Sequence, residues 1–396
     1  MRTAIVSDLH LGVASDEDVA RDRDVRRVLL EEIAGADRLV LLGDVVELRN
    51  LPVGPSLARA RPFFEELGEA LGEAEVILVP GNHDHRLAEP LLDQLSVDGV
   101  PLELEHRHPP DSGPAALIDG WLGGARLQIA YPGLWLRDDV YATHGHYMDV
   151  HLTLPRAECV AAATMVRLSG PLPSRPTPSD YEKVLRPLYG FAYALAQVLP
   201  IRRRRNGPFE KAWEVLAGEE RNRTLKTRAA RTGFPLAIRG LNGLLRADFE
   251  PDVRPPAIFR SGVAAAIEMA TRLGIDDVQV ITGHTHRGGP LPDEPEWPLP
   301  RGGRLHNTGS WVFSSAFHQP GTPPNSYWPG MVTWLEDDQP IRRVRLLNSY
   351  SHQEMTDLIT RLPLNQATRR WSARSPPPRP PAGSARRSRP GAAAGS

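Results

Sequence analysis

Five short polar motifs hold most of the residues in this chain that could do chemistry. Each follows an apolar run, and together they supply carboxylates, imidazoles and one amide: Asp8-Leu9-His10, Gly43-Asp44-Val45-Val46-Glu47, Gly81-Asn82-His83-Asp84, Thr143-His144-Gly145-His146 and Gly283-His284-Thr285-His286. Such a mixed nitrogen and oxygen set favours divalent Mn, Fe, Zn, Co or Ni over metals that select thiolates. The motifs therefore predict a metal centre, with manganese as the first expectation.

The spacing within two motifs supports this prediction. Side chains in extended chain alternate with a period of two, so Asp8 and His10 would lie on one side, as would His284 and His286. Two metal ions about 3.5–4 Å apart are a common arrangement for phosphoester hydrolysis. Such a pair needs a carboxylate between its ions, and Asp44 is the natural candidate.

The elements that must position the motifs are typical of an α/β sheet. We expect strands over 3–7, 38–42, 75–79 and 278–282, helices over 19–33, 57–71 and 85–95, closely spaced strands within 125–143, and a closing hairpin over 331–336 and 341–347. Strands that alternate with helices predict parallel pairing. Ligands in open α/β sheets gather beyond the carboxyl ends of the strands, so motifs at five strand ends can converge on one point.

The five motifs, in this order from Asp8 to His286, resemble those of the calcineurin-like metallophosphoesterase superfamily. The resemblance implies a β-sandwich of two mixed sheets flanked by helices. It also implies two sets of ligands for divalent metal ions: Asp8, His10 and His286 for the first ion, Asn82, His144 and His284 for the second, and Asp44 as the bridge between them.

The same resemblance implies an activity, the two-metal-dependent hydrolysis of a phosphomonoester, phosphodiester or pyrophosphate by a hydroxide that bridges the metals. His83 would protonate the leaving oxygen, and Asp84 would orient His83. Glu47 would accept a hydrogen bond behind the ligands, and His146 and Asn307 are candidates for contact with substrate. The alternative is a non-catalytic scaffold with the same fold. The complete set of ligand-type residues disfavours it.

One departure from the superfamily pattern narrows the substrate. The protein Ser/Thr phosphatases of this superfamily carry a phosphate-binding arginine directly after the second acidic residue of the Gly-Asp motif. Here Leu48 follows Glu47, and Arg49 comes one position later. This disfavours a protein phosphatase and leaves lipid-like and nucleotide-like phosphoesters open. Asp149 is a further candidate for lining the substrate pocket, whereas His85 is expected to be an ordinary surface or core residue.

A change in composition predicts the domain organisation. Residues 1–150 and 276–350 hold the motifs and form the expected core. Residues 151–275 are helical in pattern, broken by prolines, and carry 20 Arg and Lys against 11 Asp and Glu, which predicts a basic helical cap. Residues 365–396 are rich in Pro, Arg, Ala, Gly and Ser and contain no acidic residue, which predicts a disordered tail.

The basic segment also bears on partners. An apolar run over 188–199 is followed by the four arginines Arg202–Arg205, a combination that could contact an anionic membrane at its periphery. Nucleic acid is the less favoured partner, because no pattern of aromatic and basic residues accompanies the charges. The partner expected at the metal centre is a phosphoester substrate, and the sequence does not determine the oligomeric state.

The length and composition of the chain exclude some kinds of site and of cellular location. The chain has 396 residues, a net charge of −1 and one cysteine, Cys159, which excludes an internal disulfide and a cysteine-based zinc site. The apolar run over 188–199 would form a helix of roughly 18 Å, too short for a hydrocarbon core of about 30 Å. No apolar signal region precedes the first expected strand, so we expect a cytoplasmic protein.

Overall fold

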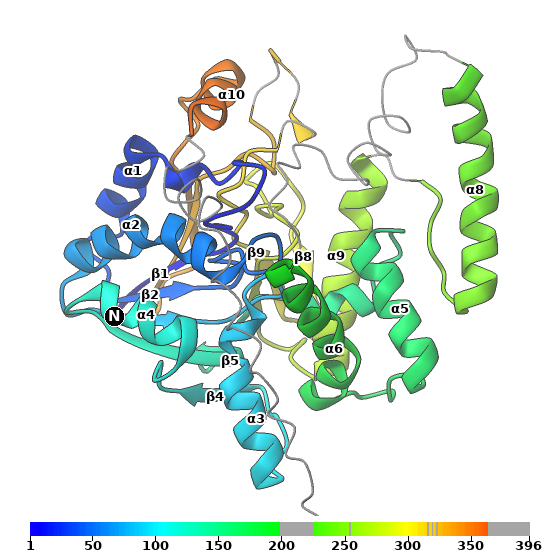
Figure 1. The fold of residues 1–396 in the computed structure, drawn as a ribbon, viewed down its shortest axis with the longest axis horizontal. Coiled ribbons are helices and arrows are strands. Elements are labelled where there is room, and N and C mark those ends of the chain that lie inside the picture. The colour runs from blue at the N-terminus through cyan, green and yellow to red at the C-terminus, as the bar shows by residue number, and fades with distance from the viewer. Residues whose placement is uncertain (199–224, 253–254, 315–316, 319, 322–323, 363–396) are drawn as a thin grey trace, which may run out of the picture.

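The computed structural model describes residues 1–198, 225–252, 255–314, 317–318, 320–321 and 324–362 (Figure 1). The arginine run Arg202–Arg205 and the tail 365–396 lie outside the described residues, so membrane contact and tail disorder stay predictions. Within the described part, the chain is a mixed α/β protein. No helix there has both the length and the apolar character needed to span a membrane.

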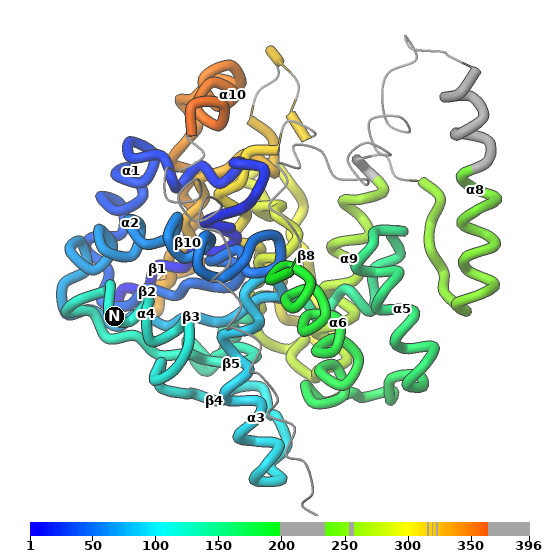
Figure 2. The backbone as a smooth tube through the Cα atoms, viewed as in Figure 1, coloured from blue at the N-terminus to red at the C-terminus, as the bar shows by residue number. Residues whose placement is uncertain are grey.

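The described strands form one hydrogen-bonded, mixed sheet in the order β11-β10-β1-β2-β3-β5-β6-β7-β9-β8, with β4 paired to β5. Their bounds are β1 Arg2–Val6, β2 Arg38–Leu41, β3 Glu75–Leu78, β4 Glu105–His108, β5 Arg126–Arg137, β6 Val140–Thr143, β7 Gln279–Thr282, β8 Trp297–Pro298, β9 Arg304–Asn307, β10 Met331–Glu336 and β11 Arg342–Arg345. β1 pairs with β2 in parallel and with β10 antiparallel, so chain segments far apart in sequence lie side by side (Figure 2).

Strand β5 connects the two halves of this sheet. Its residues up to Pro132 pair with β3 and β4, and its residues from Gly133 pair with β6. The two mixed sheets expected from the resemblance are therefore joined by hydrogen bonds through one strand of 12 residues. Ile5 and Val40 from one half share a buried apolar cluster with Ala142 and Ile281 from the other.

Helices cover the outer face of the first half. They are α1 Arg23–Ile33, α2 Val53–Leu71, α4 Gly113–Leu122 and α10 His352–Arg361, with α3 Glu89–Asp98 beside β4 and β5. In β1, Ala4 and Val6 face these helices, whereas Ile5 faces the opposite layer. Strands buried on both faces read as continuous apolar runs, which is why the strands before the motifs were recognisable in the sequence.

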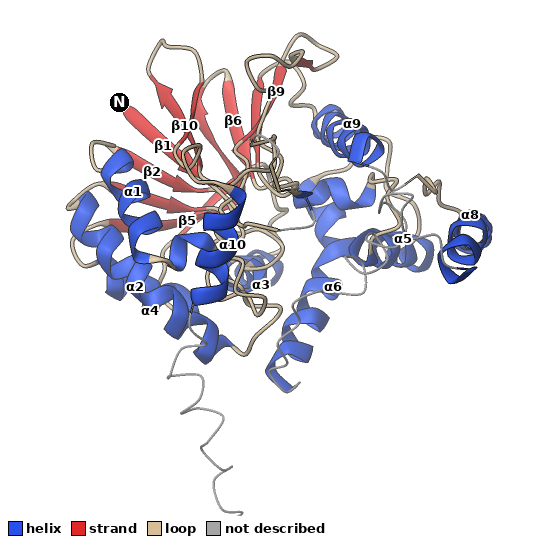
Figure 3. Cartoon of the chain, turned by 90° about the horizontal axis from the view of Figure 1, so that it is seen from above, coloured by secondary structure: helices blue, strands red, loops and turns tan. Residues whose placement is uncertain are grey.

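Residues 151–275 supply a second group of helices, which lies apart from the first in Figure 3. It comprises α5 Ala157–Ser169, α6 Pro178–Val198, α8 Leu225–Leu245 and α9 Pro255–Leu273. Apolar side chains of these helices share a buried cluster with Tyr141 of β6, Val280 of β7 and Leu305 of β9. The helical character predicted for this segment is confirmed where it is described. On α6, Tyr189 is buried, but Phe191 and Val198 are exposed.

Most of the expected elements lie within a few residues of their predicted bounds, including the antiparallel pair β10 and β11. The helix expected over 85–95 is divided into a 3₁₀ turn, His85–Leu87, and α3. Pro90 lies in the first turn of α3, where its missing N–H costs nothing. No expectation from the sequence covered β4, α4, β8, β9 or α10.

Candidate metal centre

The loops that follow β1, β2, β3, β6 and β7 meet at one edge of the sheet. Backbone hydrogen bonds hold neighbouring loops together: Asp8 N donates to Gly43 O at 3.0 Å, His10 N to Asp44 O at 2.8 Å, and Gly283 N to His144 O at 3.1 Å. The convergence expected from five motifs at five strand ends is therefore present.

The backbone reaches this arrangement through left-handed conformations at five residues of the motifs. Positive φ angles occur at Asp8 (53°), His10 (45°), Asp44 (52°), His284 (67°) and His286 (60°). The expectation that the Asp-x-His and His-x-His pairs lie in extended chain is wrong, because β1 ends at Val6 and β7 at Thr282. Non-glycine residues rarely adopt this left-handed conformation, and it concentrates at functional sites where the surrounding structure enforces it.

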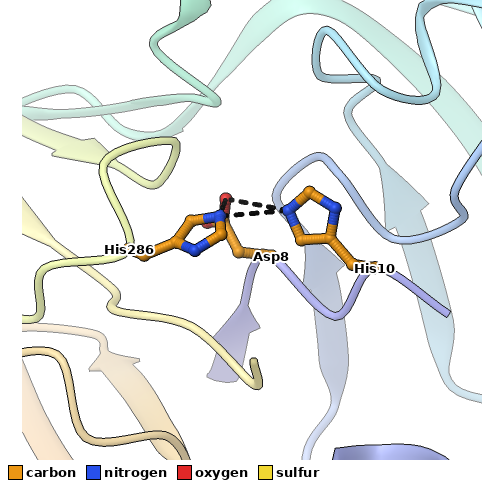
Figure 4. Close-up of side chains that lie close together, drawn as sticks. All are labelled: Asp8, His10 and His286. Atoms are coloured by element: carbon orange, nitrogen blue, oxygen red, sulfur yellow. Dashed lines mark hydrogen bonds and ion pairs between the residues drawn. The ribbon is translucent and has the colours of Figure 1, made fainter. Parts of the chain in front are cut away.

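One group of possible metal ligands is formed by Asp8, His10 and His286 (Figure 4). The Nε2 atoms of the two imidazoles are 3.0 Å apart, and Asp8 Oδ1 lies 3.3 Å from His286 Nε2 and 3.9 Å from His10 Nε2. Ser7 Oγ and His284 N donate to Asp8 Oδ2. Asp8 Oδ1 is buried, makes no hydrogen bond within the described chain, and faces the two rings.

A second group is formed by Asp44, His144 and His284. Asp44 Oδ1 accepts a hydrogen bond from His83 N at 2.7 Å. Its other oxygen, Oδ2, lies 3.3 Å from His144 Nε2 and 3.5 Å from His10 Nε2. Asp44 Oδ2 therefore lies between a nitrogen of each group, where a bridging carboxylate would have to be.

Three of the histidines in these groups each have a hydrogen-bond acceptor at one ring nitrogen. Leu42 O lies 3.0 Å from His144 Nδ1, Glu47 Oε2 lies 3.4 Å from His10 Nδ1, and Asp149 Oδ1 lies 2.7 Å from His284 Nε2. An acceptor at one ring nitrogen holds the proton there and leaves the other nitrogen with its lone pair. His144 Nε2, His10 Nε2 and His284 Nδ1 would then carry the lone pairs that a cation needs.

The amide of Asn82 lies at the second group. One end is 3.2 Å from Asp44 Oδ2 and 3.1 Å from His284 Nδ1, and the other end is 2.7 Å from Arg49 Nη1. With its nitrogen inward, the amide donates to both neighbours and its oxygen accepts from Arg49. With its oxygen inward, it adds a third acceptor at the same point, which is the orientation that a cation favours.

The partner of His83 differs from the expectation. His83 Nδ1 lies 2.7 Å from Glu47 Oε2. The carboxylate of Asp84 instead accepts from backbone N–H groups, those of Gly81 at 2.6 Å and Val45 at 2.7 Å among them. The residue that orients His83 is therefore Glu47, and Asp84 ties together the loops after β2 and β3. Asp84 is the nearer residue in sequence, but its side chain is directed into the backbone of these loops.

Burial and charge shift the pKa values in this cluster. Burial raises the pKa of Asp44, but the nearby His144 and His83 outweigh it and hold the pKa well below its usual range. Burial also raises the pKa of Glu47, and His83 and His10 reverse this and lower it. Burial lowers the pKa of His83, but Glu47 and Asp44 together raise it above its ordinary value.

Two glycines permit the close approach of the loops. A Cβ on Gly81 would collide with Asp44 Oδ1 and with the ring of His144, and a Cβ on Gly283 would collide with Asp8 Oδ2 and Ser7 Oγ. Glycine is therefore required at these two positions by the side chains around them, whatever the backbone conformation.

The two candidates for substrate contact have structural partners. Asn307 Nδ2 donates to Gly283 O at 2.6 Å, and its Oδ1 accepts from Gly309 N at 2.9 Å, so Asn307 supports the loop that carries His284 and His286. His146 lies behind His144, with ring centroids 5.7 Å apart, and its Nε2 is 3.0 Å from the hydroxyl of Tyr131.

Two residues, Asp149 and Arg49, contact the centre more closely than their place in the sequence indicated. Asp149 accepts at His284 Nε2 and holds that ring in place. Its position three residues after the fourth motif was the signal in the sequence. Arg49, one place later than the superfamily pattern, still brings its guanidinium to the Asn82 amide. No local pattern in the sequence indicated this, because the turn in which Glu47 Oε1 accepts from Arg49 N at 2.9 Å is seen only in the structure.

A pocket borders the centre at His284 and Asn307. Its other walls are largely apolar, and many of them come from helix α9 and the loop before α5. The lining includes two arginines among mostly apolar residues: Leu152, Leu154, Arg156, Ile258, Phe259, Val263, Arg287 and Tyr327. The pocket holds about 30 Å³, roughly the space of one water molecule, whereas small-molecule sites typically hold about 300–1,000 Å³.

The donor atoms fit divalent cations. Several acceptor atoms converge here, and a cation would satisfy them. They are the unpaired, buried Oδ1 of Asp8, the Nε2 atoms of His10 and His286, which are 3.0 Å apart, and Oδ2 of Asp44. The family model for calcineurin-like phosphoesterases matches residues 1–288, which include all five motifs. No curated protein matches the chain significantly. The chain belongs to the calcineurin-like phosphoesterase family.

Proposed function

We propose that this protein is a phosphoesterase that uses two divalent cations, with manganese the first candidate. Its ligands would be Asp8, His10 and His286 on one side, Asn82, His144 and His284 on the other, and Asp44 between them. The observation that supports this most directly is the position of Asp44 Oδ2 between His10 Nε2 and His144 Nε2. Two such cations, when bound, lower the pKa of a water molecule and neutralise phosphate oxygens.

His83 would act as the proton donor to the leaving oxygen. Its Nδ1 is hydrogen-bonded to Glu47, which leaves Nε2 free to meet substrate. The side chain is 22% exposed, whereas Glu47 behind it is fully buried. Burial lowers the pKa of His83, but Glu47 and Asp44 outweigh it and raise the pKa, which favours the protonated form that a general acid uses.

Arg49 would bind a phosphate oxygen. Its guanidinium is next to Asn82, lies 4.0 Å from Glu158 Oε1, and is 16% exposed. A guanidinium is always charged and matches phosphate geometry with its fork of N–H donors. Arg49 would therefore bind phosphate although it stands one position later than the arginine of the superfamily pattern.

The helices within 151–275 would act as a cap that shapes the substrate site. Helix α9 lines the pocket beside His284, and α6 brings Tyr189 over Arg49, with its ring centroid 5.8 Å from the guanidinium carbon. We accordingly propose the division into a core, 1–150 and 276–350, and an inserted cap.

A metal assay combined with turnover tests this function. The purified full-length chain is loaded in turn with Mn, Fe, Zn, Co and Ni, its metal content is measured, and hydrolysis of 4-nitrophenyl phosphate, bis(4-nitrophenyl) phosphate and pyrophosphate is followed. We expect two equivalents of metal and turnover of at least one ester. Two bound metals without turnover of any of the three would favour the non-catalytic scaffold instead.

A further inference from the structure

The first turn of helix α5, in the cap, lies beside the metal centre. Arg156 directly precedes the helix and lines the pocket that His284 borders. Two residues later, Glu158 brings its carboxylate to Arg49, with Oε1 4.0 Å from Arg49 Nη2. Cys159 of the same turn is buried in the apolar cluster that the cap shares with β6, β7 and β9, and this packing holds the turn in place.

Arg49 connects this turn of the cap to a proposed metal ligand. Its Nη1 lies 2.7 Å from the amide of Asn82, and its Nη2 is the atom that faces Glu158. The side chain of Glu158 is 38% exposed, so its carboxylate is accessible to a molecule that enters the centre. A phosphate oxygen bound by Arg49 would therefore lie close to the carboxylate of Glu158.

Positive charges around Glu158 keep it ionised. Burial raises the pKa of Glu158, but the charges of Arg156 and Arg49, with a smaller effect from His83, outweigh it and lower the pKa. The carboxylate therefore carries a full negative charge near neutral pH. This charge offsets part of the positive charge with which the two arginines would attract a phosphate.

Glu158 contributes little to the fold. An ion pair at 4.0 Å between partly exposed side chains adds little to stability. The favourable effect of an acidic residue in the first turn of a helix is small as well. A carboxylate beside a bound phosphate, in contrast, repels it directly. The main effect of this side chain is therefore expected on the ligand of the centre.

The repulsion depends on the charge of the phosphate. A phosphomonoester carries nearly two negative charges near neutral pH, because its second pKa is about 6, whereas a phosphodiester carries one. The Coulomb energy is proportional to the charge, so Glu158 opposes the monoester about twice as strongly in free energy. Expressed as an affinity ratio, the penalty for the monoester is then about the square of the penalty for the diester.

We propose that Glu158 selects against phosphomonoesters, and that the substrate presents a phosphoryl group substituted on two sides, as in a phosphodiester. This proposal rests on the proposed function, because Glu158 would act on a phosphate bound at Arg49 and the metal ions. It goes beyond that function by choosing among the phosphoester classes and by naming a specificity-determining residue on the cap.

The test uses two non-hydrolysable ligands that differ in charge. They are difluorobenzylphosphonate, a dianion near neutral pH like a monoester, and its monomethyl ester, a monoanion like a diester. The manganese-loaded, full-length parent and its Glu158→Gln variant are titrated with both by calorimetry. The variant should bind the dianion about tenfold and the monoanion about threefold more tightly than the parent, because the repulsion is removed in proportion to charge. Glu158→Ala, which also removes the charge, should give the same pattern.

Glu268→Gln is the matched control. Glu268 lies on helix α9 of the cap and also pairs with an arginine, Arg272 at 2.6 Å, but it is not among the residues that line the pocket. This variant should leave both affinities unchanged. Circular dichroism and metal content verify that each variant is folded and loaded.

The outcomes separate this inference from the proposed function. Equal gains for the two ligands, no gain, or weaker binding of both would overturn selection by charge, and so would the same gains in Glu268→Gln. Any of these results in a protein that still hydrolyses phosphoesters would leave the function standing. The expected gains in a protein without turnover would support the selection and contradict the function. A parent that binds neither phosphonate would contradict both.

Discussion

His83 Nδ1 and Glu47 Oε2 are 2.7 Å apart, and the same Glu47 oxygen lies 3.4 Å from His10 Nδ1. A single buried carboxylate thus positions both the proposed proton donor and a proposed metal ligand. His83 also forms a third group of possible ligands with His10 and Asp44. Two roles for His83, acid and ligand, can therefore be distinguished by experiment.

His83→Asn should keep both metal ions and lower kcat by about 10²–10⁴-fold on alkyl phosphates, whose leaving groups need a proton. Hydrolysis of 4-nitrophenyl phosphate should fall much less, because nitrophenolate leaves without protonation. The measurement is kcat for both substrates beside metal content. The control is His106→Asn, which changes a histidine of β4 that belongs to none of the groups of possible ligands. Equal losses on both substrates would indicate phosphate binding, and a loss of metal would make His83 a ligand.

Asp44→Asn should release most of the metal from one site, because the amide replaces a charged oxygen that lies between both groups. Activity should fall by more than about 100-fold, since even partners outside the ligand set contribute 10- to 100-fold. Metal content and turnover are measured beside Asp111→Asn, which changes an exposed carboxylate in the same way. A variant with both metals bound and full turnover would rule out a bridging role.

Asp149→Asn should weaken metal binding about 10- to 100-fold at one site. The reason is that Asp149 accepts at His284 Nε2 and thereby orients the ring so that Nδ1 faces the centre. The other site should keep its affinity. Competition with a chelator, followed separately for the two metal equivalents, measures this difference. An unchanged affinity at both sites would show that His284 needs no carboxylate to orient it.

His85 should make stability depend on pH. Burial lowers the pKa of His85, but Glu182 and Glu89 outweigh it and raise the pKa to about 9. An imidazole with a raised pKa in the folded state stabilises the protein fully below about pH 6.5, and this contribution is lost as the pH rises to 9. The loss is on the order of 3 kcal/mol.

The check is urea unfolding of the parent and of His85→Gln between pH 6 and pH 9.5. The parent should lose its advantage over the variant across this range. A difference in unfolding free energy that does not change with pH would show that His85 keeps its ordinary pKa. The comparison between the two proteins cancels the contributions of the other histidines.

The sequence by itself determined the family and the set of residues at the centre. Apolar runs such as Val76–Val79 have to be buried on both faces, so they could be recognised as strands without long-range information. A residue that directly follows such a run then lies at the carboxyl end of a strand, and these ends share one edge of the sheet. That is why Asp8, Asp44, Asn82, His144 and His284 could all be assigned to one place.

Only the tertiary structure decided how these residues are oriented and what surrounds them. The left-handed backbone at Asp8 and His10 is enforced by hydrogen bonds to the loop after β2, which no local pattern encodes. Glu47 rather than Asp84 holds His83, because the loops after β2 and β3 pack side by side. Tyr189 reaches the centre because Glu182, on the same helix, is bound by core residues more than 30 positions away in sequence. Such contacts depend on the packing of whole elements, and therefore appear only when the chain is folded.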